Sequence, residues 1–227
     1  MGNIIDDIRA NEDTFADRPF NEVDSLALAQ LSYARMPVNV PRLDAEATDV
    51  DLAMVGVRDL LRAECYDDMF GKVWSPSMNV DLLRAMCESP RWRDLRVGGY
   101  VDEFDPETTK QFSACVFDVG DGSSYVAFRG TDSTIVGWKE DFAMAFRRPV
   151  AAQESAARYL ADIAGLRDGP LMVGGHSKGG NLAVYAAANA PAAVQERLIA
   201  VFCHDGPGFD ADFFDTPGYA RVAPLVD

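Results

Sequence analysis

The first part of the chain carries its apolar residues at the spacing of an α-helix. They recur three and four positions apart over 23–31, and Asn21 stands where the N-cap of that helix is expected. The same spacing predicts a helix over Asp49 to Arg62 and another that begins near Asn79. We therefore expect residues 1–95 to form a helical region that packs on the rest of the chain.

The pattern changes near Val97, where runs typical of β-strands begin. Residues 98–104 fit a strand, and 112–119 is apolar at nearly every position, as in a strand that is buried on both faces. The glycines within 120–122 indicate a turn, so 125–128 is predicted to be the returning strand. A sheet is therefore expected to begin here.

Helices and strands then alternate. Helical spacing over 156–163 is followed by an apolar strand at 171–173, an alanine-rich helix at 182–190 and a strand at 198–203. This alternation predicts an α/β fold, with a mostly parallel sheet and helices on both of its faces. Residues 96–227 are expected to form this core, with the active groups at the carboxyl ends of its strands.

The net charge of the chain limits the kinds of partner that it can bind. The 227 residues carry a formal net charge of -15, and 48% of them are hydrophobic, which is enough for a globular core. Binding to phosphates needs clustered Lys and Arg, so this charge disfavours nucleic acid and anionic lipid surfaces as partners. No apolar stretch is long enough to span a bilayer, so we expect no stable membrane insertion.

Cysteine and histidine usage argues against a metal site. The chain has only two histidines, and its cysteines lie among apolar neighbours without the spacing of metal ligands or of a disulfide framework: Cys65, Cys87, Cys115 and Cys203. The first residues have neither the cationic nor the apolar part of a secretory signal. We expect reduced core cysteines, a cytoplasmic protein, and no metal or organic cofactor.

The most informative segment joins a predicted strand to a predicted helix. It reads Gly-His-Ser-Lys-Gly over 175–179, between the strand at 171–173 and the helix at 182–190. A serine in such a strand–turn–helix elbow is typical of the nucleophile of α/β-hydrolases, and the glycines let strand and helix approach closely. The elbow predicts an α/β-hydrolase-type fold with Ser177 as nucleophile. Lys178 would then supply a backbone N–H to the oxyanion.

A second oxyanion donor is expected at the end of an earlier strand. The predicted strand at 125–128 runs into Arg129, Gly130 and Thr131. Thr131 offers both a backbone N–H and a hydroxyl, so it is the candidate for this role. The alternative is an ordinary strand end with a glycine turn.

Two of these motifs carry a resemblance. Phe-Arg-Gly-Thr at 128–131, followed by Gly-His-Ser-x-Gly-Gly at 175–180, resembles the class-3, fungal-type lipases. The chain is more similar still to a bacterial group of lipase-like proteins, through Val-Asp-Ser-Leu-Ala-Leu-Ala-Gln-Leu-Ser-Tyr at 23–33 and Gly-Trp-Lys-Glu-Asp-Phe at 137–142. The resemblance implies an α/β-hydrolase fold and an oxyanion role for Thr131. It does not reveal the substrate.

The stretch 135–146 is the candidate for a lid. It mixes large apolar residues with the charged residues Lys139, Glu140 and Asp141. An amphipathic segment beside a nucleophile suits a mobile cover over an acyl pocket, and the class-3 lipases carry a lid helix at the corresponding place. A helix that simply faces the core is the alternative.

The general base is harder to assign. Hydrolases of this fold carry the acid and then the histidine after the serine. After Ser177 the chain offers only His204, which Asp205 follows, while His176 is expected to pack beside the elbow. Three hypotheses stay open: the base and acid lie beyond Asp227 in a longer protein, which we favour; His204 and Asp205 form an unusual pair; or the fold is catalytically inactive.

The sequence thus predicts a serine hydrolase that cleaves a small-molecule ester or a lipid through an acyl-enzyme on Ser177. The alternative from a different class is a binding or scaffold protein built on a catalytically incomplete hydrolase fold.

Overall fold

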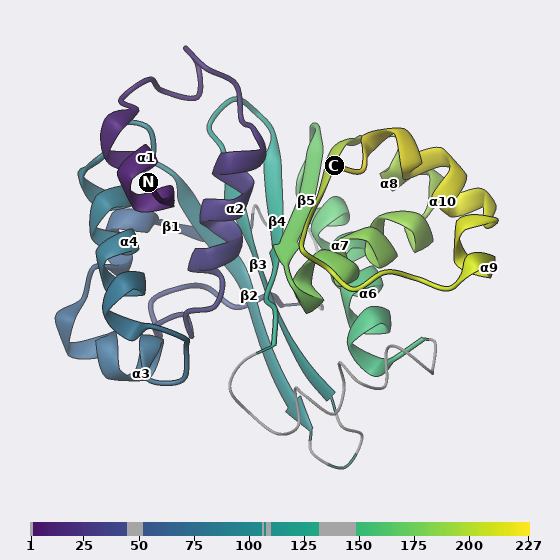
Figure 1. Ribbon diagram of the computed structural model, residues 1–227, viewed down its shortest axis with the longest axis horizontal. Helices are drawn as coiled ribbons and strands as arrows, with labels where there is room; N and C mark the ends of the chain where they lie inside the picture. Colours follow the sequence, from purple (N-terminus) through teal and green to yellow (C-terminus); the bar gives the residue numbers. More distant parts are fainter. Residues whose placement is uncertain (1, 45–51, 106, 108–109, 132–148) are drawn as a thin grey trace.

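The computed structural model describes residues 2–44, 52–105, 107, 110–131 and 149–227. Within these ranges the strands form one six-stranded sheet, in which their spatial order follows the sequence (Figure 1). The strands are β1 (Met54–Gly56), β2 (Arg96–Asp105), β3 (Lys110–Asp118), β4 (Ser124–Phe128), β5 (Leu171–His176) and β6 (Leu198–His204).

The sheet is mixed, so the expectation of a mostly parallel sheet is wrong. Strands β1 to β4 pair antiparallel, and only β4, β5 and β6 run parallel to one another. The reason lies in the connections. Short links reverse the chain between β2, β3 and β4, including a turn in which Gly120 and Gly122 adopt φ of 90° and 89°. Parallel pairing needs a long crossover, which helices provide only after β4.

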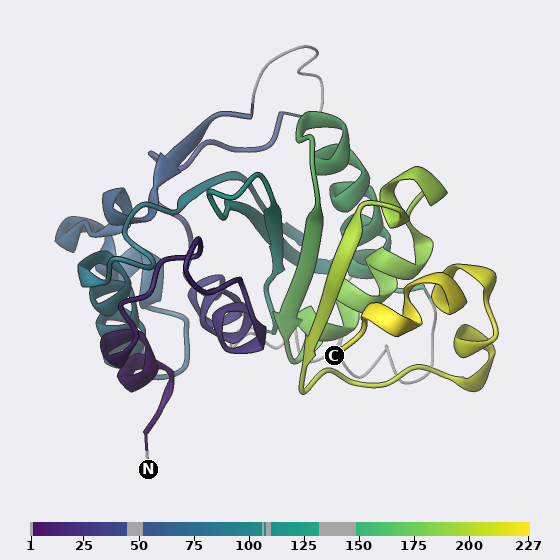
Figure 2. The same ribbon diagram turned by 90° about the horizontal axis from the view of Figure 1, so that it is seen from above.

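Helices cover both faces of the sheet. In Figures 1 and 2, α1, α2 and α4 lie on one side, and α6 and α7 lie on the other. The helices are α1 (Ile4–Ala10), α2 (Glu22–Leu31), α3 (Tyr66–Phe70), α4 (Pro76–Glu88), α6 (Ala151–Leu166), α7 (Lys178–Asn189), α8 (Ala192–Gln195), α9 (Ala211–Phe214) and α10 (Pro217–Val222). Short 3-10 turns occupy Val57–Leu60, Ala63–Cys65 and Ala223–Leu225.

Two apolar cores result, one on each face. Along β4, Tyr125 and Ala127 belong to the core beneath α1, α2 and α4, whereas Val126 and Phe128 belong to the core beneath α6 and α7. Side chains alternate between the faces of a strand, so a strand covered on both sides must be apolar at successive positions. This accounts for the nearly continuous apolar run that predicted a central strand at 112–119.

The amino-terminal region is not purely helical. The helix predicted over 49–62 is wrong for its described part, which holds β1 and the 3-10 turn Val57–Leu60. Met54 pairs with Gly98 and Gly56 with Arg96, so this short strand becomes the edge of the sheet. A three-residue strand is decided by the partner it pairs with, because it has too few residues for a pattern of its own.

Two interactions, a helix cap and a buried ion pair, hold the amino terminus of helix α2. As predicted, Asn21 caps it, with its side chain accepting hydrogen bonds from the N–H groups of Val23 at 2.9 Å and Asp24 at 3.2 Å. Asp24 also forms a fully buried ion pair with Arg91, whose Nε lies 2.9 Å from the carboxylate. The remaining guanidinium nitrogens donate to the carbonyls of Asp13, Thr14, Arg18 and Pro19.

Three further sequence predictions concern the lid, the cysteines and membrane insertion. The candidate lid at 135–146 lies outside the described residues. The four cysteines are free thiols, and burial raises the pKa of Cys115 to about 12, which suits an inert core residue. Among the helices that the structure describes, none has the length and apolar character needed to cross a bilayer.

Candidate active site

The predicted strand–turn–helix connection is present around Ser177. Strand β5 ends at His176, α7 begins at Lys178, and Ser177 joins them with φ of 55° and ψ of -128°. A positive φ is rare for serine, and it persists only where the surroundings hold it. Here the Ser177 N–H donates to the His204 carbonyl at 2.8 Å, and the Ser177 carbonyl accepts from the Gly180 N–H at 2.9 Å.

The flanking glycines are required by close backbone contacts. A Cβ on Gly175 would lie 2.5 Å from the Phe128 oxygen and 2.4 Å from the carbonyl carbon of Gly179. A Cβ on Gly179 would lie only 2.2 Å from the same Phe128 oxygen. The elbow is therefore pressed against the end of β4, which is the strand that leads to Thr131.

The segment before Thr131 runs along the elbow. A Cβ on Gly130 would lie 2.6 Å from the His176 oxygen, and a Cβ on Gly179 would lie 3.1 Å from the Gly130 nitrogen. Thr131 itself is half-buried. The structure thus brings together the ends of β4 and β5, which carry the predicted nucleophile segment and the predicted oxyanion segment.

Lys178 has a buried side chain. Its Nζ donates to the Gln111 carbonyl on β3 at 2.8 Å, and only 1% of the residue is exposed. The ammonium group is therefore engaged by the sheet, which argues against a Ser–Lys pair. The backbone of Lys178 opens α7, where the N–H groups of the first turn present partial positive charge.

The two histidines lie side by side at the ends of β5 and β6, where His176 pairs with His204 in the parallel register. Both imidazoles bond to the amino-terminal region. Nε2 of His204 lies 2.9 Å from Oγ of Ser25, and Nδ1 of His176 lies 2.9 Å from the hydroxyl of Tyr33. Among the described hydrogen bonds, neither imidazole is joined to Ser177.

The surroundings of His204 favour the neutral form of its imidazole. Burial is the main cause that lowers its pKa below the ordinary value of 6.5, and the neighbouring His176 lowers it further. The carboxylates of Asp227 and Glu22 raise this pKa, but the net shift is still downward. A neutral imidazole is the form that can accept a proton.

Asp205 follows His204 in a strained turn. It is exposed and has φ of 52°, and among the described non-glycine residues only Ser75, Ser177 and Asp205 have positive φ. Two of these three therefore stand at the carboxyl ends of adjacent parallel strands. Gly206 then packs on the start of α7, where a Cβ would lie 2.8 Å from the Asn181 nitrogen.

Three further residues near the histidines, Ser25, Tyr33 and Tyr125, carry no site signal in the sequence. Ser25 Oγ lies 2.8 Å from the Tyr125 hydroxyl, which also donates to the Ser25 carbonyl at 3.2 Å, so His204 ends a buried chain of three polar groups. Tyr33 and Ser25 are 143 and 179 positions away from the histidines that they contact. No local pattern links residues so far apart. Helical spacing predicted a helix over 23–31 and resemblance marked 23–33, but neither signal indicated these contacts.

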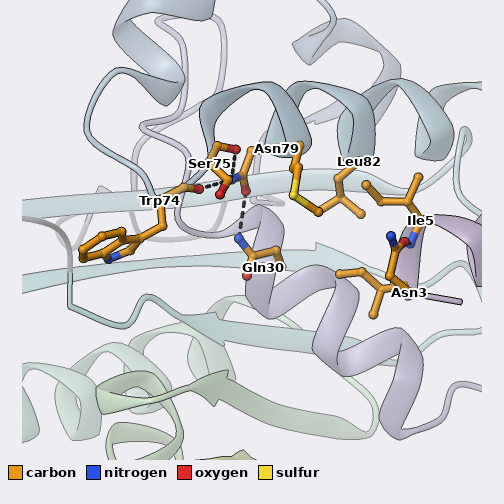
Figure 3. A pocket seen from close by; sticks show the side chains of 9 residues that line it. Asn3, Ile5, Gln30, Trp74, Ser75, Asn79 and Leu82 are labelled. Atoms are coloured by element: carbon orange, nitrogen blue, oxygen red, sulfur yellow. Dashed lines mark hydrogen bonds between the residues drawn. The ribbon is translucent and has the colours of Figure 1, made fainter. Parts of the chain in front are cut away.

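A separate cavity of about 280 Å³ lies between α1, α2 and α4 (Figure 3). Its polar wall is a hydrogen-bonded set, in which Gln30 donates to Asn79 at 2.8 Å and Asn79 donates to the Trp74 carbonyl at 2.8 Å. None of the residues that line it belongs to the elbow or to the Thr131 segment. A smaller polar cavity of about 100 Å³ is lined in part by Tyr33 and Arg129, and none of its lining residues belongs to 175–179.

Comparison with known proteins bears on the same region. A family model described as Mbeg1-like matches residues 86–227, which is more than half of the chain and includes β2 to β6 and the elbow. No curated protein and no solved structure matches. The chain belongs to the Mbeg1-like family, which is a lipase-like family.

Proposed function

We propose that this protein is a serine hydrolase of the lipase or esterase type, which cleaves a carboxylic ester through an acyl-enzyme on Ser177. One observation carries the proposal. Ser177 is held at positive φ at the junction of β5 and α7, and the segment that leads to Thr131 is packed against that junction. Strain of this kind is characteristic of functional positions, and membership of a lipase-like family supports the same class of reaction.

The proposed reaction runs in two halves. Oγ of Ser177 forms a bond to the ester carbonyl carbon while its proton passes to a base, and the N–H groups of Lys178 and Thr131 stabilise the oxyanion. Collapse of this intermediate breaks the carbon–oxygen bond, and the leaving alcohol takes the proton. Water then attacks the acyl group, releases the carboxylic acid and restores the serine. No step needs a metal or an organic cofactor.

The general base of the proposed mechanism has two candidates. His204 is the candidate in the described chain, because its lowered pKa favours the neutral imidazole and Asp205 follows it directly. To serve, the imidazole has to exchange its hydrogen bond with Ser25 for one with Ser177. A histidine and an acid in a longer protein are the other hypothesis.

A second candidate function follows from the same hydrogen bonds. Both imidazoles are engaged by Ser25 and Tyr33 rather than by Ser177, as expected if the fold binds a partner without catalysis. This candidate predicts a Ser177 hydroxyl of ordinary, low reactivity.

A fluorophosphonate probe separates the two candidates. We expect the probe to label the full-length protein and Ser177→Ala to abolish the labelling. Ser75→Ala is the matched control, because Ser75 also has positive φ but lies at the start of α4, away from the elbow. Failure to label a folded full-length protein would favour the binding function. Hydrolysis of a short p-nitrophenyl ester, with and without His204→Gln, then tests whether His204 is the base.

A further inference from the structure

The hydroxyl of Tyr33 lies where the two halves of the proposed site meet. Tyr33 follows the last turn of α2 and is 9% exposed. Its hydroxyl lies 2.9 Å from Nδ1 of His176 and 3.5 Å from the carbonyl oxygen of the same residue. His176 directly precedes Ser177, so this contact reaches the elbow itself.

The same hydroxyl occupies the space beside Gly130. A Cβ at position 130 would lie 2.0 Å from the Tyr33 oxygen and 2.7 Å from Cζ of its ring. Only a residue without a side chain fits there, because a methyl group would displace the tyrosine or the strand end. Gly130 directly precedes Thr131, so one hydroxyl contacts the residues just before both the proposed nucleophile and the proposed oxyanion donor.

We infer that Tyr33 is a positioning residue that sets the spacing between the Thr131 segment and the Ser177 elbow, an inference that rests on the proposed function. Oxyanion stabilisation depends on donors that are aimed before the reaction begins, and small displacements of a donor reduce the rate strongly. A buried aromatic ring suits this task because packing locks its few rotatable bonds. The Tyr33 ring also packs against the His176 ring, with centroids 6.0 Å apart.

This role makes the amino-terminal region part of the site. Residue 33 lies outside the range 86–227 that the family model matches. Helix α2, which leads to Tyr33, is in turn tied to that range by the buried pair of Asp24 and Arg91. The helices of this region therefore do more than cover one face of the sheet.

The test compares Tyr33→Phe with Tyr159→Phe in the full chain. Tyr159 is a matched control, because it is also buried and its hydroxyl also has a backbone partner, the Gly99 carbonyl at 2.8 Å, in the core under α6. We expect Tyr33→Phe to slow fluorophosphonate labelling of Ser177, and to lower kcat for ester hydrolysis, by about 10- to 100-fold. KM should change little, because the substitution removes only the hydroxyl and leaves the ring in place. Tyr159→Phe should keep the original rates with a similar shift in Tm.

A spectroscopic readout reports the contact directly. The ¹⁵N resonance of His176 Nδ1 should move in Tyr33→Phe and stay in place in Tyr159→Phe, because only the first variant removes the partner of that nitrogen. Gly130→Ala provides a second variant that leaves Tyr33 intact. It should slow labelling in the same way by forcing the strand end away from the hydroxyl.

The outcomes are distinct. Equal labelling rates in Tyr33→Phe, Tyr159→Phe and the unmodified chain would overturn the positioning role while leaving the hydrolase intact. A loss of rate matched by Tyr159→Phe would overturn it as well, since the effect would then be one of stability. An unmodified, folded full-length protein that does not react with the probe overturns the proposed function itself.

Discussion

At the scale of single residues, the elbow depends on the absence of a Cβ atom at position 179. Gly179 faces the Phe128 oxygen at a distance that leaves no room for a methyl group. We expect Gly179→Ala to cost at least about 3 kcal/mol of the free energy of unfolding, because the strand or the helix has to move. Gly165→Ala is the control, since position 165 lies in α6 with open space around it and alanine should stabilise that helix by up to about 1 kcal/mol. Urea unfolding measures both, and equal effects would contradict the close contact.

His204 makes stability depend on pH. Burial disfavours its charged form, so the unfolded chain binds more protons than the folded one and stability rises with pH. The contribution is present above the ordinary pKa of 6.5 and is lost as the pH falls through the lower pKa of the folded state. We expect His204→Gln, which keeps a polar group for Ser25, to lose less Tm than the unmodified chain between about pH 7.5 and about pH 5. Parallel pH dependences would contradict this.

At the scale of elements, one arginine holds the amino-terminal segments to the core. The Arg91 side chain is completely buried against Asp24, so its removal leaves a buried carboxylate without its countercharge. We expect Arg91→Ala to cost about 3–5 kcal/mol in denaturant unfolding. Arg58→Ala is the control, because the ion pair of Arg58 with Asp94 is exposed and should contribute less than about 1 kcal/mol. Similar costs for the two variants would show that α2 is held in another way.

At the scale of the whole molecule, we expect that the family range, residues 86–227, does not fold completely on its own. A chain of residues 86–227 lacks α1, α2, β1 and most of α4, so one face of the sheet loses its cover. The apolar side chains left on that face include Phe117, Tyr125 and Met172. We expect this fragment to bind a hydrophobic dye and to lack the near-UV circular dichroism of the full chain. Cooperative unfolding of the fragment with native-like spectra would contradict this prediction.

Local signals predicted the parts of the fold that depend on neighbours in the chain. Asn21 caps α2, glycines turn the chain between β3 and β4, and Gly175 and Gly179 frame the elbow. Each of these features acts over a few residues, so its steric or hydrogen-bonding requirement is visible in the sequence. The candidate nucleophile and its position between strand and helix could therefore be read directly.

Tertiary structure decided the features that depend on distant partners. Strand β1 exists because β2 offers it an edge, the ammonium of Lys178 is taken by Gln111, and the two histidines turn toward Ser25 and Tyr33 rather than toward Ser177. A polar group bonds to whichever partner the packing brings near once water is excluded, and chain distance does not limit that choice. The sequence alone thus determined the strained turn that carries the serine, and the packing of helix α2 on the sheet decided its polar surroundings.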